Sequence, residues 1–193
     1  MEHDWKLTVT FPTHSLAGAE TTATAIRMIL FHVYSNPRIL FKLRTEIENA
    51  RPSSPITNAE ASTLPYLQAV IKEGVRIFPS ITGLLLKDVP PEGDSYQGQH
   101  IPAGIAIGYS AMGMLMNKKI WGDDAETFRP ERFLEGPEDE VQARNSTVEY
   151  AFGYGRWRCL GRNIAQMELN KTITEVSQLP PTNTDFLPWL SVS

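Results

Sequence analysis

Residues 152–161 read Phe-Gly-Tyr-Gly-Arg-Trp-Arg-Cys-Leu-Gly, and this stretch holds the only cysteine of the 193-residue chain, Cys159. Gly153 and Gly155 allow tight backbone turns and a close approach to a flat ligand. The residues after Gly161 have the pattern of a helix, and a helix N-terminus with arginines nearby favours a thiolate, the form that binds metal. A lone cysteine can also be a small buried apolar residue. The glycines and the positive charge favour a functional site.

The spacing resembles the haem-binding loop of the cytochrome P450 family, Phe-x-x-Gly-x-Arg-x-Cys-x-Gly, in which the cysteine is the axial ligand of the iron. The resemblance implies that Cys159 is the metal ligand of a haem cofactor. It also implies that the haem is bound by the other matching or neighbouring residues of the loop and of the helix after it, namely Phe152, Gly155, Arg156, Trp157, Arg158, Gly161 and Ala165. One position departs from the pattern, because the family's arginine falls on Trp157.

Composition limits the other classes of function. A net charge of −4 and a sequence pI of about 5.6 argue against a nucleic-acid binder. The one basic and aromatic cluster, residues 156–162, could hold phosphates, but the haem interpretation assigns its charges to the haem propionates. One cysteine excludes an intrachain disulfide and fits a reducing compartment. The four histidines lie far apart and predict no metal site. We expect no signal peptide and no membrane anchor in this chain.

Residues 15–36 have the apolar period of a helix that Pro37 ends, and they include the hexapeptide Ala-Gly-Ala-Glu-Thr-Thr at positions 17–22. Its glycine costs about 1 kcal/mol in a helix relative to alanine, which a purely structural helix would avoid. The acid and the threonines could alternatively form the first turn of the helix. The hexapeptide resembles the oxygen-activation motif of the cytochrome P450 family at every position. The resemblance implies that Thr21 donates a hydrogen bond to dioxygen and that Glu20 relays protons.

A further helix is predicted from residues 65 to 78, and it places Glu73 and Arg76 on adjacent turns of one side. By itself such a pair is usually an exposed ion pair of small energy. In the cytochrome P450 family the pair is buried and joined by an arginine from a Pro-Glu-Arg-Phe segment, which is present here as residues 130–133 and supplies Arg132. The resemblance therefore implies a structural clamp of Glu73, Arg76 and Arg132 beneath the cysteine loop.

The remaining segments complete a mainly α fold with a small β-sheet. We expect helices at 37–50 and from Cys159 to about 179, and short strands between 81 and 109. A methionine-rich core helix is expected at 110–117, and residues 122–149 are predicted to be a polar surface loop. In the resemblance, the position of a strand residue that contacts a haem propionate falls on Asp88, with Lys87 beside it.

Four segments agree with the cytochrome P450 family in order and spacing: residues 17–22, 73–76, 130–133 and 152–161. We therefore expect a single partial domain over 1–193, the C-terminal part of the cytochrome P450 fold truncated at both ends. Its family-like core is expected at 15–179, followed by an unplaced tail at 180–193.

The resemblance implies a haem-thiolate monooxygenase that inserts one atom of O2 into a small apolar organic substrate. It also implies NADPH–cytochrome P450 reductase as the partner, and filamentous-fungal secondary metabolism as the setting. Full-length relatives are expected at the endoplasmic reticulum membrane, and this chain alone in the cytoplasm or at a membrane surface. Two alternatives stay open: a non-catalytic remnant of such an enzyme, and a helical interaction module whose cysteine is only packed.

Overall fold

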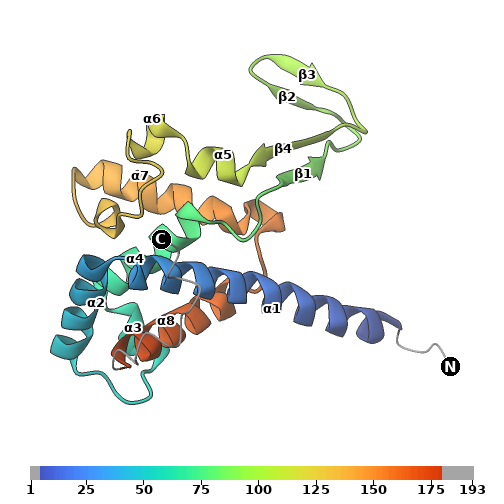
Figure 1. Cartoon of the computed structure of the whole chain (residues 1–193). Coiled ribbons are helices and arrows are strands. Elements are labelled where there is room, and N and C mark those ends of the chain that lie inside the picture. Colours follow the sequence, from blue (N-terminus) through green and yellow to red (C-terminus); the bar gives the residue numbers. More distant parts are fainter. Residues whose placement is uncertain (1–4, 180–193) are drawn as a thin grey trace, which may run out of the picture.

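The computed structural model describes the backbone of residues 5–179 and the side chains of residues 17–179, so the tail predicted at 180–193 lies outside the described residues. Helices dominate, and the few strands form a separate projection, as Figure 1 shows. The chain is therefore mainly α with a small β component, as the sequence predicts. The helices are α1 (Trp5–Tyr34), α2 (Pro37–Ala50), α3 (Asn58–Ser62), α4 (Pro65–Ile77), α5 (Ala111–Leu115), α6 (Lys118–Trp121), α7 (Glu138–Val148) and α8 (Arg162–Gln178), with 3-10 turns η1 (Pro130–Phe133), η2 (Glu149–Phe152) and η3 (Gly155–Trp157).

Proline and asparagine set the start of the first helices, as local sequence predicts. Pro37 occupies the first turn of α2, where its missing N–H costs nothing, and the side chain of Asn36 accepts a hydrogen bond from the backbone N–H of Ile39 at 3.3 Å. Pro65 has the same place in α4. The predicted boundaries of these two helices are confirmed to within one residue.

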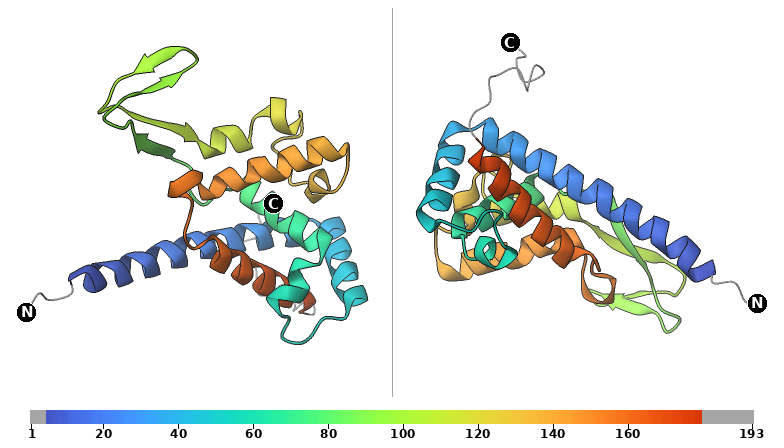
Figure 2. Two further views of the ribbon diagram at one scale, coloured as in Figure 1. Left: turned by 180° about the vertical axis from the view of Figure 1, so that it is seen from behind. Right: turned by 90° about the horizontal axis from the view of Figure 1, so that it is seen from below.

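The core lies where α1, α2, α4 and α8 pack together, and α1 and α8 run side by side in Figure 2. The close approach of α1 to α4 depends on Gly74, because a Cβ there would lie 2.1 Å from Cγ1 of Ile29. The apolar side chains of these four helices with no exposed surface are Ile29, Val33, Ile39, Leu43, Leu67, Val70 and Ile173. None of the helices in the described part of the chain is both long and apolar enough to cross a bilayer.

The strands form two antiparallel pairs in series. β1 (Leu84–Asp88) pairs with β4 (Ala106–Ser110), from Leu84 opposite Ser110 to Asp88 opposite Ala106. Between them, β2 (Asp94–Tyr96) and β3 (Gln99–Ile101) form a hairpin that points away from the helices in Figure 1. The hairpin turns through Gln97 and Gly98, with φ values of 52° and 78°. Two left-handed residues suit the twist of a two-residue hairpin loop.

Two expectations about the helices are corrected. α1 begins at Trp5, ahead of the predicted residue 15, so residues 17–22 lie inside the helix and do not form its first turn. Residues 138–148, predicted as surface loop, form α7. Three acidic residues in its first turn suit the positive end of the helix dipole, but Val148 is its only buried side chain, so the apolar period that marks a helix is missing.

The expectation that methionines fill the core at 110–117 is confirmed for Met116, which is partly buried and packs against the core. In α5 the buried residues are Ala111 and Leu115, whereas Met112 is exposed.

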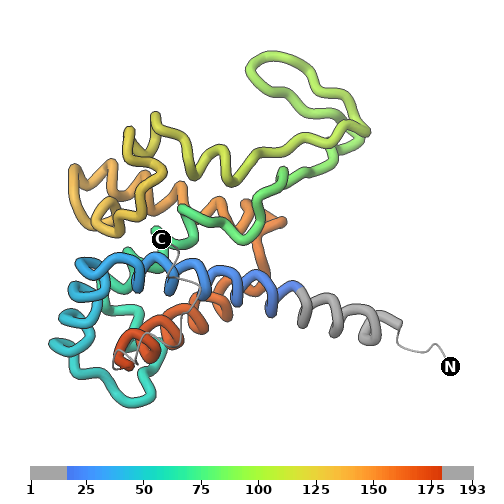
Figure 3. Tube along the Cα trace, viewed as in Figure 1, coloured from blue at the N-terminus to red at the C-terminus, as the bar shows by residue number. Residues whose placement is uncertain are grey.

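From α7 the chain passes through residues 152–161 and descends into α8, a path that Figure 3 traces in orange and red. The cysteine loop therefore connects the level of α7 to the level of α1 and α8.

Candidate functional site

The cysteine loop is a closed turn that two left-handed glycines shape. Gly153 and Gly155 have φ values of 79° and 61°, a region that other residues seldom adopt. A Cβ at residue 153 would also lie 2.9 Å from the carbonyl oxygen of Trp157. The loop closes where the backbone N–H of Cys159 donates to the carbonyl oxygen of Phe152 at 2.7 Å. This hydrogen bond fixes the backbone of the candidate ligand directly.

Cys159 is exposed and lies immediately before α8. Its carbonyl oxygen accepts from the backbone N–H of Arg162 at 3.4 Å, and Gly161 stands at the N-cap without a side-chain cap. The expected position of the thiol at a helix N-terminus is thus confirmed. The alternative of a buried structural cysteine is contradicted. Ala165 follows in the first turn, its N–H bonded to the carbonyl oxygen of Gly161 at 2.9 Å.

Several large apolar side chains close to the cysteine in the sequence are exposed. Leu160, Ile164 and Met167 follow one another at helical spacing, and Leu160 is 88% exposed. Tyr154 and Trp157 extend this apolar surface into the loop, with 63% and 60% of their area exposed. Large apolar side chains that are left exposed together are typical of a surface that binds a ligand or another protein. With the thiol and the glycine turns it gives the donor, the cradle and the contact surface that a haem needs.

The arginines in and beside the loop bond to different partners, and the sequence interpretation did not predict which. Arg158 forms an ion pair with Glu149, the first residue of η2. Arg162 grips the same carboxylate with two hydrogen bonds of 2.7 Å, and its guanidinium lies 5.8 Å from the ring of the partly buried Phe152. Arg156 lies over the ring of Trp157 at 5.0 Å and makes no ion pair with any described residue. Of these three arginines, Arg156 is the one without an ion partner among the described residues.

Glu149 is the ion partner of the loop arginines that the sequence interpretation missed. Burial raises the pKa of its carboxyl group, but the hydrogen bonds and charges of Arg162 and Arg158 outweigh burial and leave the pKa below its ordinary value. The only signal in the sequence is an acid shortly before a basic loop, which predicts no particular pairing.

The strand β1 also contacts the loop. Nζ of Lys87 lies 6.0 Å from the ring of Tyr154 and donates to its carbonyl oxygen at 3.4 Å. Side chains alternate along a strand, so Asp88 points to the opposite face from Lys87. Lys87 is the residue of this strand that contacts the cysteine loop, and the expectation that Asp88 takes the propionate-contact position stays a prediction.

The predicted catalytic pair lies in the middle of α1. The hydroxyl of Thr21 donates to the carbonyl oxygen of Ala17 at 2.7 Å, and the carbonyl oxygen of Thr21 accepts from Ser80 at 2.8 Å. A Cβ at Gly18 would meet no atom within 4 Å, and Glu20 is exposed. Within residues 17–179, no hydrogen bond joins Thr21 or Glu20 to the cysteine loop. α1 packs on α8, the helix that follows the cysteine loop.

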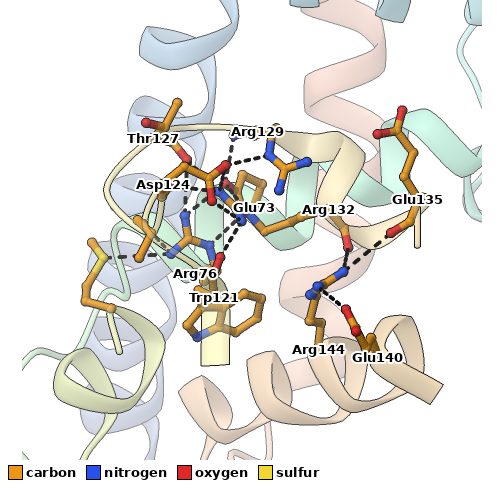
Figure 4. Close-up of polar contacts among 12 residues, drawn as sticks. Glu73, Arg76, Trp121, Asp124, Thr127, Arg129, Arg132, Glu135, Glu140 and Arg144 are labelled. Atoms are coloured by element: carbon orange, nitrogen blue, oxygen red, sulfur yellow. Dashed lines mark hydrogen bonds and ion pairs between the residues drawn. The ribbon is translucent and has the colours of Figure 1, made fainter. Parts of the chain in front are cut away.

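The predicted clamp is present, as Figure 4 shows, and its three side chains are fully buried. Arg76 donates to the two carboxylate oxygens of Glu73 at 2.7 and 2.9 Å, and Arg132 donates to one of them at 2.9 Å. All three side chains are 0% exposed. The remaining N–H groups of the two guanidinium groups find partners as well: the carbonyl oxygens of Leu115, Trp121, Asp124, Ala125 and Thr127. Buried charges are tolerable only when they are paired in this way.

One detail of the clamp is corrected. Its hydrogen bonds tie α4 to residues 115–132, and in the described part of the chain none of them reaches residues 152–161. The clamp therefore supports the segment between α5 and η1, and it does not lie directly under the cysteine loop.

The fold, the clamp and the cysteine loop together define a haem-thiolate protein, and comparison with known proteins gives the family. Residues 3–178 match the family described as Cytochrome P450, so the chain belongs to the cytochrome P450 family. The cofactor of this family is a haem whose iron has an axial thiolate ligand.

Individual relatives are fungal. The chain is 47% identical over 165 residues to Cytochrome P450 monooxygenase aba1 of Botryotinia fuckeliana and 46% identical over 166 residues to ABA1 of Pyricularia oryzae, in each case with 83% of this chain and 32% of the relative covered. It is 41% identical over 160 residues to Pisatin demethylase of Fusarium vanettenii, with 83% of this chain and 30% of that protein covered. The chain thus spans about a third of the length of the curated relatives it matches.

Proposed function

We propose that this chain forms the C-terminal, haem-thiolate part of a fungal monooxygenase that inserts one atom of dioxygen into a small apolar organic substrate. The observation that carries the proposal is the exposed Cys159 on a glycine-shaped loop at the start of α8. The fungal relatives support it, and one of them is named a demethylase. Secondary metabolism is the proposed setting.

Cys159 is the proposed axial ligand of the haem. When bound, a thiolate-ligated haem supplies the chemistry of oxygen cleavage, with electrons from NADPH through a reductase that docks near the cysteine face. The predicted haem-binding residues of the loop and of α8 have different proposed roles, according to their side chains. Phe152, Trp157 and Ala165 offer apolar surface, and Gly155 and Gly161 let the backbone approach. Arg156 holds a propionate, and Arg158 supports the loop.

Thr21 and Glu20 are proposed to deliver protons. The hydroxyl of Thr21 has one donor and two acceptor sites, and its hydrogen can rotate from the carbonyl oxygen of Ala17 toward a ligand. The absence of atoms within 4 Å of a Cβ at Gly18 leaves room beside that hydroxyl. The exposed carboxylate of Glu20 can exchange protons with water and pass them toward Thr21. We propose that the whole enzyme acts at the endoplasmic reticulum membrane.

The test is the absorption spectrum of the purified chain after it is supplied with haem, reduced and exposed to carbon monoxide. A strongly red-shifted Soret band is expected for thiolate ligation. Cys159→Ala should abolish the band, whereas Arg158→Gln should retain haem better than Arg156→Gln. Haem bound without that band contradicts the ligand assignment and favours a non-catalytic remnant. A chain that takes up no haem favours either the remnant or an interaction module.

Proton delivery has its own readout, the product formed per NADPH consumed. If the assembled enzyme is active, Thr21→Ala should lower this ratio. Without the hydroxyl, proton delivery is disturbed and NADPH is consumed without forming product. An unchanged ratio would remove Thr21 from the mechanism and leave the role of Cys159 untouched.

A further inference from the structure

One carboxylate bonds to residues on both sides of Cys159. Oε1 and Oε2 of Glu149 accept from Nη2 and Nε of Arg162 at 2.7 Å each, and Oε2 also accepts from Arg158. Arg158 precedes the cysteine by one residue and Arg162 follows it by three. Glu149 is the first residue of η2, directly after α7, so its own backbone belongs to a regular segment outside the loop.

The loop has few other anchors. Residues 154–160 are all exposed, so core packing contributes little to their order. At the start of the loop, Phe152 packs against the core, and Tyr154 contacts Lys87 and the ring of Tyr150, which stacks on it at 5.5 Å. These contacts hold only the start of the loop. Next to the sulfur, the Glu149 carboxylate bonds to Arg158 and Arg162.

The geometry separates this cluster from an ordinary surface ion pair. Exposed pairs between two flexible side chains contribute little, because both side chains must be ordered in water. Here the Arg162 fork is bidentate, the carboxylate side chain is only 33% exposed, and a second arginine shares an oxygen. Lys72 adds positive charge from α4, where its ammonium donates to Asn145 at 2.6 Å.

We propose that Glu149 is a positioning residue for Cys159, which it holds in place by bonding Arg158 and Arg162 at the same time. The inference rests on the proposed role of Cys159 as a ligand and extends it to the residue that keeps this ligand in place. Glu149 also pairs with the positive charge of Arg158 and Arg162, so that Arg156 is left as the arginine available to an anionic ligand group.

The first test needs no haem, so it is independent of the proposed function. Glu149→Gln removes the charge and keeps the shape. Hydrogen exchange of the amides of residues 152–162 should become faster by about tenfold, because local order depends on few contacts there. The matched control Glu140→Gln makes the same charge change at an exposed ion pair on α7, where Glu140 binds Arg144 at 2.7 Å. It should leave that exchange unchanged.

A double-mutant cycle distinguishes the mechanism. If Glu149 acts through Arg162, then Glu149→Gln combined with Arg162→Gln should speed exchange no more than Glu149→Gln alone. With haem supplied, the fraction of bound haem that shows the thiolate-type carbon monoxide band should fall in Glu149→Gln and stay constant in Glu140→Gln. Exchange unchanged in Glu149→Gln, additive effects in the cycle, or loss of structure throughout the chain would each overturn the proposal.

Discussion

Replacing Glu73 with glutamine tests whether the buried clamp is the main electrostatic support of this fold. The substitution keeps the shape of the side chain and removes its charge. Glu73 accepts four hydrogen bonds: two from Arg76, one from Arg132 and one, at 2.8 Å, from the backbone N–H of Arg129. Two guanidinium groups with 0% exposure would then lack their buried counter-ion.

The expected loss of unfolding free energy is about 3–5 kcal/mol, the usual cost when one partner of a buried ion pair is removed. The backbone carbonyl groups around the two arginines soften the loss but carry no full charge, and Asp124, 39% exposed, is too hydrated to replace Glu73. A loss of this size is a large part of the total stability of most domains. Arg132→Lys keeps the charge but loses the fork of N–H groups, so it should cost less than Glu73→Gln.

The assay is urea unfolding followed by far-UV circular dichroism. With an m-value of about 2 kcal/mol/M, the midpoint should fall by about 1.5–2.5 M in Glu73→Gln. The control is Glu140→Gln, where the broken pair is exposed and the expected loss is below about 0.5 kcal/mol. A loss below about 1 kcal/mol in Glu73→Gln, with an unchanged m-value, would refute the reasoning.

Two further predictions concern packing and pH. Gly74→Ala should destabilise the chain by about 1–3 kcal/mol, because the new Cβ would lie 2.1 Å from Cγ1 of Ile29. Ile29→Ala in the same chain should then cost less than it does alone, and additive losses would contradict the contact. Burial lowers the pKa of His32 below 6.5 against the opposing charge of Glu73, and its ring stacks on Phe128 at 4.7 Å. The folded chain therefore binds fewer protons than the unfolded chain just below pH 6.5, so stability should fall as pH drops from 7 to 5.5. His32→Phe should flatten this dependence in urea titrations at several pH values, and an equal slope in both proteins would rule His32 out.

Local signals account for the parts of the fold that sequence reasoning predicts well. Pro37 and Pro65 start helices because their fixed φ suits a first turn, and Gly98 permits the hairpin turn because it tolerates positive φ. α7 was missed for a related reason. A helix with a single buried side chain has no apolar period to detect, although its acidic first turn is visible in the sequence.

By itself, the sequence determined the family, the candidate ligand Cys159, and the presence of the clamp, because each depends on residue types at short and regular spacings. Only the tertiary structure decided which charges meet. In the folded chain, Arg158 pairs with Glu149, and Arg156 has no ion partner among the described residues. Lys87 rather than Asp88 contacts the loop, and the clamp bonds to residues 115–132. The physical reason is that an ion pair depends on the distance and burial of side chains from separate segments, and these are settled only when the helices pack.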